Sequence, residues 1–237
     1  MTKPFQFKQF TVNQDQCAMK IGTDGILLGA WAPLETQPFA TLDIGAGTGI
    51  LSLMLAQRSP AEVIDALEID ALAYEQCVEN FEASPWRDRL FCYHAALAEF
   101  TSEIEDKYDF IICNPPFYSE DYKTESLQRD VARFQDAMPF EHLLDSVSKL
   151  LVEDGVFCTI IPYKEEAKFI TLASSVKLKA YKITRVRGTT TSAIKRSLVA
   201  LSFRESTIKI NELVIEHERH LYTKEYINLT KDFYLKM

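Results

Sequence analysis

The segment Thr41-Leu-Asp-Ile-Gly-Ala-Gly-Thr-Gly-Ile50 determines the fold that we expect for this chain. It joins a short β-branched and apolar run, typical of a strand, to residues 50–57, whose sequence has helical character. Glycines at 45, 47 and 49 permit a tight turn and let the backbone approach a ligand without a Cβ in the way. A glycine-rich turn between a strand and a helix is a typical context for cofactor binding. We therefore expect a cofactor here rather than a turn without a ligand.

Short apolar runs alternate with helix-like segments over most of the chain. The expected helices are Ile50–Gln57, Ala71–Phe81 and Phe140–Leu151, and the expected strands are Thr41–Ile44, Val63–Ile69, Leu90–Tyr93, Tyr108–Cys113, Val156–Ile161, Ala180–Arg187 and Leu198–Phe203. This alternation predicts an α/β, Rossmann-like fold whose seven-stranded sheet is mostly parallel and covered on both faces. The last two strands are too close in sequence for a crossover helix, so they should form a C-terminal antiparallel hairpin.

We expect a single globular domain in which residues 41–237 carry the sheet and residues 1–40 form an N-terminal arm and cover segment. Phe5, Phe7 and Phe10 alternate with polar residues, which suits a strand or an extended arm. The sequence does not decide between a structural cover and a functional arm. At the other end, Lys224–Leu235 carries apolar residues at helical spacing and should dock on the core.

The composition is that of an ordinary globular protein. The chain has 237 residues, of which 47% are hydrophobic and 25% charged. Its longest nearly uncharged apolar stretch, Gly25–Leu34, is about half of what a membrane-spanning helix needs, and no secretory signal is apparent, so we expect a cytoplasmic protein without a membrane partner. The five cysteines lack the paired spacing of metal ligands and should be buried free thiols, so no metal is expected.

Two carboxylates distinguish between possible cofactors. Glu68 follows Gly49 by 19 residues and ends the second strand, where an acid binds ribose hydroxyls in dinucleotide folds. A nicotinamide site favours G-x-G-x-x-G, but the third glycine here comes one residue earlier and Asp43 precedes the turn. A carboxylate there would repel a pyrophosphate and suit the cationic amino-acid portion of S-adenosylmethionine. We therefore expect S-adenosylmethionine at Asp43, Gly45, Gly47, Gly49 and Glu68.

The segment Asn114-Pro-Pro-Phe117 ends the fourth expected strand, at the edge where open α/β sheets bind ligands. Pro115 and Pro116 stiffen the backbone. The Asn114 side-chain oxygen and the Pro115 carbonyl can accept both hydrogens of an NH2 group, and Phe117 offers a face for stacking. These four residues are the expected catalytic set, although an Asn-Pro-Pro turn on its own can be merely structural.

These motifs carry a resemblance to known proteins. The Asp-x-Gly-x-Gly-x-Gly turn followed by Glu68 resembles motifs I and II of the class I methyltransferases, and Asn-Pro-Pro-Phe resembles the signature of amino-methyltransferases that act on adenine, cytosine or glutamine amide nitrogen. Together with Phe7–Val12, Cys17–Pro33 and Leu229–Met237, they make the chain similar to bacterial tRNA (adenine-N6)-methyltransferases that modify adenine 37, beside the anticodon of valine tRNA. The resemblance implies a tRNA partner and no obligate protein partner.

The resemblance also implies that Lys20–Gly25 lies against the cofactor, which makes Thr23 and Asp24 further cofactor-binding candidates. From the residues alone, either one could equally be a helix N-cap. One departure is the segment 94–97, which reads His-Ala-Ala-Leu where related methyltransferases usually carry an aspartate that contacts the cofactor adenine. We expect a backbone contact there or none.

Charge is distributed unevenly along the chain. The formal net charge of −8 argues against a uniformly basic nucleic-acid-coating protein. Residues 181–209, however, hold seven basic residues and one acidic residue, a local charge of +6, so the remainder carries −14. Arg185, Arg187, Lys195 and Arg196 are therefore the expected ligands of RNA phosphates. The alternative is an edge hairpin whose charges prevent aggregation.

Three other functions are compatible with parts of this pattern. Methylation of a glutamine amide in a protein would use the same catalytic turn, but the basic hairpin and the N-terminal resemblance disfavour it. A cofactor-binding module that holds RNA without catalysis is disfavoured by the intact Asn-Pro-Pro-Phe. A nicotinamide oxidoreductase is disfavoured by Asp43 and by the glycine spacing.

Overall fold

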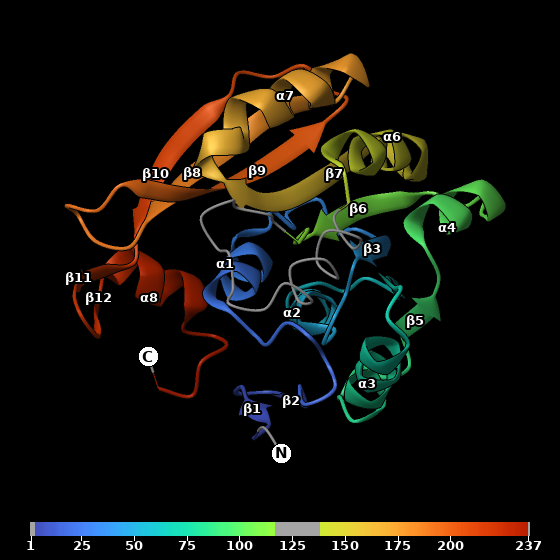
Figure 1. The fold of residues 1–237 in the computed structure, drawn as a ribbon, viewed down its shortest axis with the longest axis horizontal. Helices are drawn as coiled ribbons and strands as arrows, with labels where there is room; N and C mark the ends of the chain where they lie inside the picture. Colours follow the sequence, from blue (N-terminus) through green and yellow to red (C-terminus); the bar gives the residue numbers. More distant parts are fainter. Residues whose placement is uncertain (1–2, 117–137, 237) are drawn as a thin grey trace, which may run out of the picture.

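The computed structural model describes residues 3–116 and 138–236, and an eight-stranded sheet lies at its centre (Figure 1). The strands follow the order β10-β8-β9-β7-β6-β3-β4-β5. Their bounds are β3 (Ala40–Ile44), β4 (Val63–Glu68), β5 (Leu90–His94), β6 (Tyr108–Cys113), β7 (Leu151–Pro162), β8 (Lys179–Arg187), β9 (Ile194–Ser202) and β10 (Lys209–Val214). All neighbouring strands are parallel except where β9 pairs with β7 and β8. The expected mostly parallel sheet and antiparallel hairpin are confirmed.

The strand β10 is an addition to the seven strands expected from the sequence. It pairs in parallel with β8, so that Lys209 lies opposite Lys182 and Val214 opposite Arg187. Most of its side chains are exposed, and Leu213 is its buried residue. A strand with so little apolar pattern gives only a weak sequence signal. Because β10 covers β8, the predicted hairpin does not form the edge of the sheet.

Helices cover both faces of the sheet. They are α1 (Thr23–Trp31), α2 (Ile50–Arg58), α3 (Ala71–Glu82), α4 (Leu97–Glu103), α6 (Phe140–Leu150), α7 (Glu166–Ser175) and α8 (Lys224–Thr230). Residues of α1, α2, α3 and α8 share one hydrophobic cluster with the sheet, and residues of α4, α6 and α7 share the other. The expected two-sided cover is therefore present (Figure 1).

The two ends of the described chain pack together. The short strands β1 (Phe5–Gln6) and β2 (Thr11–Val12) form a hairpin, and Phe7 forms an isolated bridge with Tyr234. Phe7 and Phe10 are buried, so this segment covers the core instead of projecting as an arm. The expected C-terminal helix ends at Thr230, and the chain then reaches the bridge at Tyr234. Two further short strands, β11 (Glu216–Glu218) and β12 (Leu221–Tyr222), precede α8.

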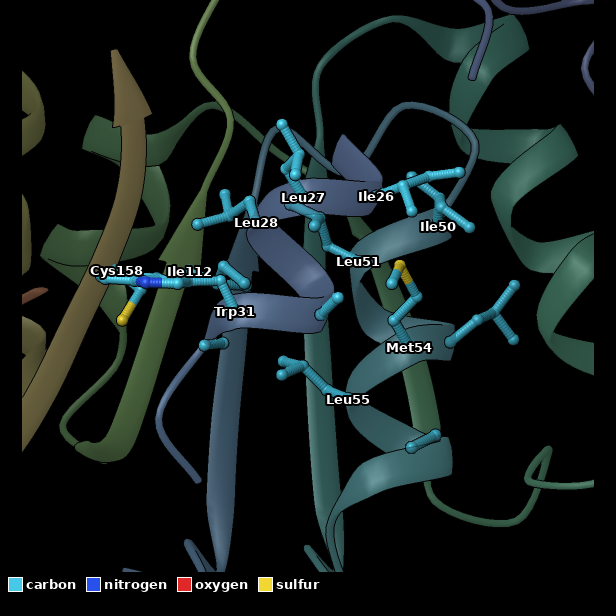
Figure 2. Close-up of a cluster of buried hydrophobic side chains, with 14 of the residues drawn as sticks. Ile26, Leu27, Leu28, Trp31, Ile50, Leu51, Met54, Leu55, Ile112 and Cys158 are labelled. Atoms are coloured by element: carbon cyan, nitrogen blue, oxygen red, sulfur yellow. The ribbon is translucent and has the colours of Figure 1, made fainter. Parts of the chain in front are cut away.

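Helix α1 is a core element within residues 1–40, which were expected to form an arm and cover segment, with a helix start at Thr23 or Asp24 left open. Its residues from Gly25 to Trp31 are all buried, and Figure 2 shows its apolar side chains packed against α2 and the sheet. Gly29 lets the two helices approach closely, since a Cβ there would lie 2.6 Å from the Met54 sulfur. The Arg58 guanidinium donates to the Gly29 carbonyl at 2.7 Å, and the Trp31 indole donates to the Thr184 hydroxyl at 2.9 Å. These contacts fix α1 against the sheet.

Candidate active site at the carboxyl edge of the sheet

The glycine-rich turn connects β3 to α2, and its three glycines all have positive φ: 73° at Gly45, 55° at Gly47 and 76° at Gly49. The backbone N–H groups of Gly45 and Ala46 both donate to the Leu67 carbonyl at 2.9 Å, which ties the turn to β4. A Cβ at Gly45 or Gly47 would meet nothing within 4 Å. This side of the turn is therefore open for a ligand to approach the backbone.

Gly49 has a second, steric requirement, which a matched pair of variants can isolate. A Cβ there would lie 2.6 Å from Phe81 Cε1 and 2.9 Å from Cys77 Sγ in α3. We predict that Gly49→Ala destabilises the protein by about 1–3 kcal/mol more than Gly45→Ala, because both incur the positive-φ cost but only Gly49→Ala overpacks the core. Urea unfolding of the two variants measures the difference. Equal losses at the two positions would contradict this packing role.

Glu68 ends β4 and is fixed beside the glycine turn. Its Oε2 accepts a hydrogen bond from Gly47 N at 2.7 Å, and its Oε1 accepts from the N–H groups of Ile69 and Asp70 at 2.9 Å each. The residue is only 9% exposed, so these contacts hold the carboxylate in one place. Ile69, which the sequence analysis did not select, is 63% exposed and offers an apolar surface directly after this carboxylate. Its only sequence signal was its position at the end of a strand-like run.

Asp43 lies beneath the turn and is fully buried. Its Oδ2 accepts from the Ser52 backbone N at 3.1 Å and from the Ser52 hydroxyl at 2.8 Å, whereas Oδ1 has no hydrogen-bond partner within the described residues. Burial raises the pKa of the Asp43 carboxyl to about 7, against an ordinary value of 3.8. A buried carboxylate oxygen without a partner is suited to a cationic ligand group.

We predict that the stability of the unliganded protein falls between about pH 4 and pH 7 and that Asp43→Asn flattens this fall. With its raised pKa, the native Asp43 carboxyl holds a proton that the unfolded chain releases, so rising pH favours the unfolded state through this window. Asparagine has no such proton, and its side-chain oxygen can still accept from Ser52. Urea unfolding at several pH values measures the effect. A pH dependence identical in wild type and variant would contradict it.

Asn114 follows β6 directly and lies beside the glycine turn. Strand β6 pairs with β3 so that Cys113 is opposite Ile44, and the next residues along the two strands are Asn114 and Gly45. Asn114 is half-buried. The first turn of α1 approaches it, since a Cβ on Gly25 would lie 4.0 Å from Asn114 Nδ2. The sheet therefore brings the two sequence motifs together at one edge.

The rest of the proposed catalytic turn is only partly described. Pro115 is buried and Pro116 is half-buried. Phe117, the proposed stacking residue, lies outside the described residues.

Thr23 and Asp24 occupy the first turn of α1, and neither caps it. The N-cap position is Gly22, and no side chain caps this helix, so the N-cap alternative for these two residues is wrong. Asp24 Oδ2 accepts from Arg196 Nε at 2.7 Å. Thr23 is exposed and lines a cavity of about 350 Å³ with residues outside the glycine turn, among them Phe5, Tyr222 and Tyr234.

Three of the four expected RNA-binding cations are held in ion pairs. Besides Arg196 with Asp24, Arg185 Nη2 lies 2.7 Å from Glu166 Oε1, and Arg187 Nη2 lies 2.7 Å from Glu212 Oε2. Lys195 is exposed. The local charge of +6 is thus reduced by acids that lie outside residues 181–209, so the hairpin is not the uncompensated basic surface that the sequence predicted.

The chemistry of the edge is that of backbone, amide and carboxylate groups. Within residues 3–116 and 138–236, no group of three or more His, Cys, Asp or Glu side chains could hold a metal ion.

The helices in this same part of the chain are all too short or too polar to span a membrane. All five cysteines are free thiols, and four of them are buried, whereas Cys92 is half-buried.

This architecture, with a glycine turn after the first sheet strand and an acid at the end of the second, defines a class I S-adenosylmethionine-dependent methyltransferase. A predicted O-methyltransferase from Agrobacterium tumefaciens has the same fold, with a TM-score of 0.69 at 20% sequence identity over 89% of this chain and 96% of that chain. The family model of the methyltransferase small domain matches residues 31–168. The family and the fold identify S-adenosylmethionine as the methyl donor.

Sequence comparison defines the family more narrowly. The chain is 66% identical to the tRNA1(Val) (adenine(37)-N6)-methyltransferase of Flavobacterium johnsoniae, over 98% of this chain and 100% of that protein. It is 44% identical to the protein of the same name from Bacteroides fragilis, over the full length of both chains. The chain belongs to the tRNA1(Val) (adenine(37)-N6)-methyltransferase family, which confirms the resemblance found in the sequence.

Proposed function

We propose that this chain transfers a methyl group from S-adenosylmethionine to the N6 amino nitrogen of adenine 37 in valine tRNA. Relatives named for this reaction support the proposal along the full length of the chain. The structural observation that supports it is the pairing of Ile44 with Cys113. Because of this register, the glycine turn proposed to bind the cofactor and Asn114, proposed to accept the amino hydrogens, follow neighbouring strand ends. Donor and acceptor would thus be held side by side, and such positioning provides most of the rate enhancement of a direct transfer.

The cofactor would be held by Asp43, Gly45, Gly47, Gly49 and Glu68. The residues fit the group: the open side of the turn admits it, and the partnerless Asp43 Oδ1 suits the ammonium of its amino-acid portion. Glu68, which its contacts with backbone N–H groups hold in place, would accept hydrogen bonds from the ribose hydroxyls. When bound, S-adenosylmethionine supplies an electrophilic methyl group. Thr23 and Asp24 stay proposed contacts, with Asp24 oriented by Arg196.

The target base would be turned out of the anticodon loop, as enzymes that modify bases require. Asn114 Oδ1 and the Pro115 carbonyl would accept the two N6 hydrogens and direct the nitrogen lone pair toward the methyl group. The carbonyl acceptors would polarise the amino group without a charged general base, and the proton that N6 loses on methylation would pass to solvent. Pro116 stiffens the turn, and Phe117 is the proposed stacking surface for the adenine.

The proposed RNA-binding surface has fewer uncompensated cations than the sequence alone predicted. Lys195 is its exposed cation, and the ion-paired side chains of Arg185, Arg187 and Arg196 keep between 23% and 34% of their surface accessible. A phosphate that approaches these arginines would meet charges already balanced by carboxylates. We infer that phosphate contacts position the tRNA here and that shape and base contacts provide more of the specificity.

Label transfer from tritiated S-adenosylmethionine tests this function and separates it from glutamine methylation. The purified protein is incubated with bulk tRNA or with a cell protein extract, and the product is digested to nucleosides or amino acids. We expect label in N6-methyladenosine from the tRNA. Label recovered as methylglutamine from protein, with none in tRNA, would overturn the proposal.

A further inference from the structure

Tyr163 is an exposed aromatic residue at the carboxyl edge of the sheet. It directly follows β7 and begins the short 3₁₀ helix η1 (Tyr163–Glu165). The residue is 37% exposed, and the Arg185 Cζ lies 5.3 Å from its ring centroid. A cation at this distance attracts the ring, and more than a third of the residue's surface stays accessible to solvent.

The cation behind the ring is held by a buried carboxylate. Arg185 donates to Glu166 through Nη2 at 2.7 Å and through Nε at 3.2 Å to each carboxylate oxygen. Ser197 donates its hydroxyl to the same carboxylate, and Glu166 is only 7% exposed. Arg185 is therefore neutralised and fixed, which makes it a poor phosphate ligand and a rigid support for the Tyr163 ring.

The register of the sheet places Tyr163 close to the proposed catalytic turn. Strands β6 and β7 are neighbours, and Cys113 pairs with Thr159. Asn114 is one residue beyond this pair and Tyr163 is four residues beyond it, so their backbones are about 10 Å apart along the strands and about 5 Å apart across them. An adenine bound at Asn114 would have adjoining nucleotides of its loop within reach of this ring.

The chemistry around the ring suits a nucleotide. Single exposed apolar side chains are common on proteins and need no explanation, but this ring is held in place on a fixed cation. Lys164, the next residue, is exposed and can face a phosphate. Aromatic side chains bind unpaired bases by stacking with little sequence preference, because every base presents a π-face.

We propose that Tyr163 is a stacking platform for an unpaired anticodon-loop nucleotide next to the methylated adenine. The proposal rests on the proposed function, since it requires a tRNA substrate at Asn114. Tyr163 would contact the substrate, whereas Arg185 and Glu166 would act as positioning residues that hold its ring. The platform adds to tRNA recognition and takes no part in cofactor binding.

The test compares kcat/KM for valine tRNA among variants of Tyr163. Tyr163→Ala and Tyr163→Leu should lower it by at least about 5-fold, the lower limit for loss of one base–aromatic stack, while Tyr163→Phe keeps activity within about 2-fold of wild type. Phe39→Ala is the matched control, because Phe39 is 58% exposed but precedes β3, at the opposite end of the strands. Affinity for S-adenosylmethionine should be unchanged in all four variants.

Two results would overturn the platform. One is wild-type kcat/KM in Tyr163→Leu, which keeps apolar bulk but has no aromatic face. The other is an equal loss in Tyr163→Phe and Tyr163→Ala, which would indicate a role for the hydroxyl. If the wild-type enzyme methylates tRNA and Tyr163→Leu has the same kcat/KM, the stacking platform is excluded but the proposed function stands. If the wild-type enzyme does not methylate tRNA, both the proposed function and the platform are excluded.

Discussion

Replacing Asn114 with alanine is expected to lower kcat for tRNA methylation by about 10²- to 10³-fold, the usual effect of removing one aligned polar group from an active site. The amide oxygen is proposed to accept an N6 hydrogen, and alanine leaves that hydrogen without a partner. Because Asn114 is beside the cofactor turn but not part of it, the affinity for S-adenosylmethionine should stay near its wild-type value. Single-turnover methylation and calorimetry measure the two quantities separately.

Asn114→Asp provides the control for this prediction. Aspartate keeps a side-chain acceptor at the same place, so its loss of kcat should be smaller than that of alanine. An alanine variant that is folded, binds the cofactor and methylates tRNA at the wild-type rate would contradict the proposed role of Asn114.

Replacing Glu68 with alanine is expected to weaken S-adenosylmethionine binding by about 10- to 150-fold, the range for loss of a hydrogen bond to a charged group. The carboxylate would lose its proposed contacts with the ribose hydroxyls, and the Gly47 N–H would lose the acceptor that now fixes the turn. At saturating cofactor, kcat should largely recover, because Asn114, the proposed catalytic residue, follows a different strand, β6. Calorimetric titration gives the affinity.

The control for Glu68 is Glu75→Ala, which removes an exposed carboxylate from the nearby helix α3. It should bind the cofactor as wild type does. Equal affinity in wild type and Glu68→Ala would exclude Glu68 from the cofactor site.

The sequence predicted those parts of the site that depend on local pattern and strand order. Parallel strands end at a common edge, so a turn after β3, an acid at the end of β4 and an amide after β6 were expected to lie near one another. Two contacts show that these segments do lie together. Gly47 N donates a hydrogen bond to Glu68, and Ile44 pairs with Cys113.

Contacts between distant segments could not be predicted in this way. Asp24 and Arg196 are 172 positions apart, and the sequence assigned one to the cofactor and the other to RNA. Counting charges along the chain suggested a basic hairpin, because the count cannot show which acids fold against the basic residues. The position of the Tyr163 ring against Arg185 likewise depends on a tertiary contact, the ion pair of Arg185 with Glu166.

Helix α1 was not among the helices expected from periodicity, for a different reason, although a helix start near Thr23 or Asp24 was left open. Gly25 and Gly29 are poor helix formers, and the helix is apolar on nearly all sides, so it shows no amphipathic period. Its stability comes from close packing on α2, which requires the glycine at 29. Tertiary contact outweighs local propensity here.

The position of the methyl group in valine tRNA shows whether adenine 37 is the target of this enzyme. Valine tRNA from cells that lack this activity is incubated with the protein and S-adenosylmethionine, digested to oligonucleotides and mapped by mass spectrometry, beside a tRNA in which adenine 37 is replaced by guanine. We expect one N6-methyl group at adenine 37 and none in the tRNA with guanine at that position. Methylation of another nucleotide, or equal methylation of both tRNAs, would contradict it.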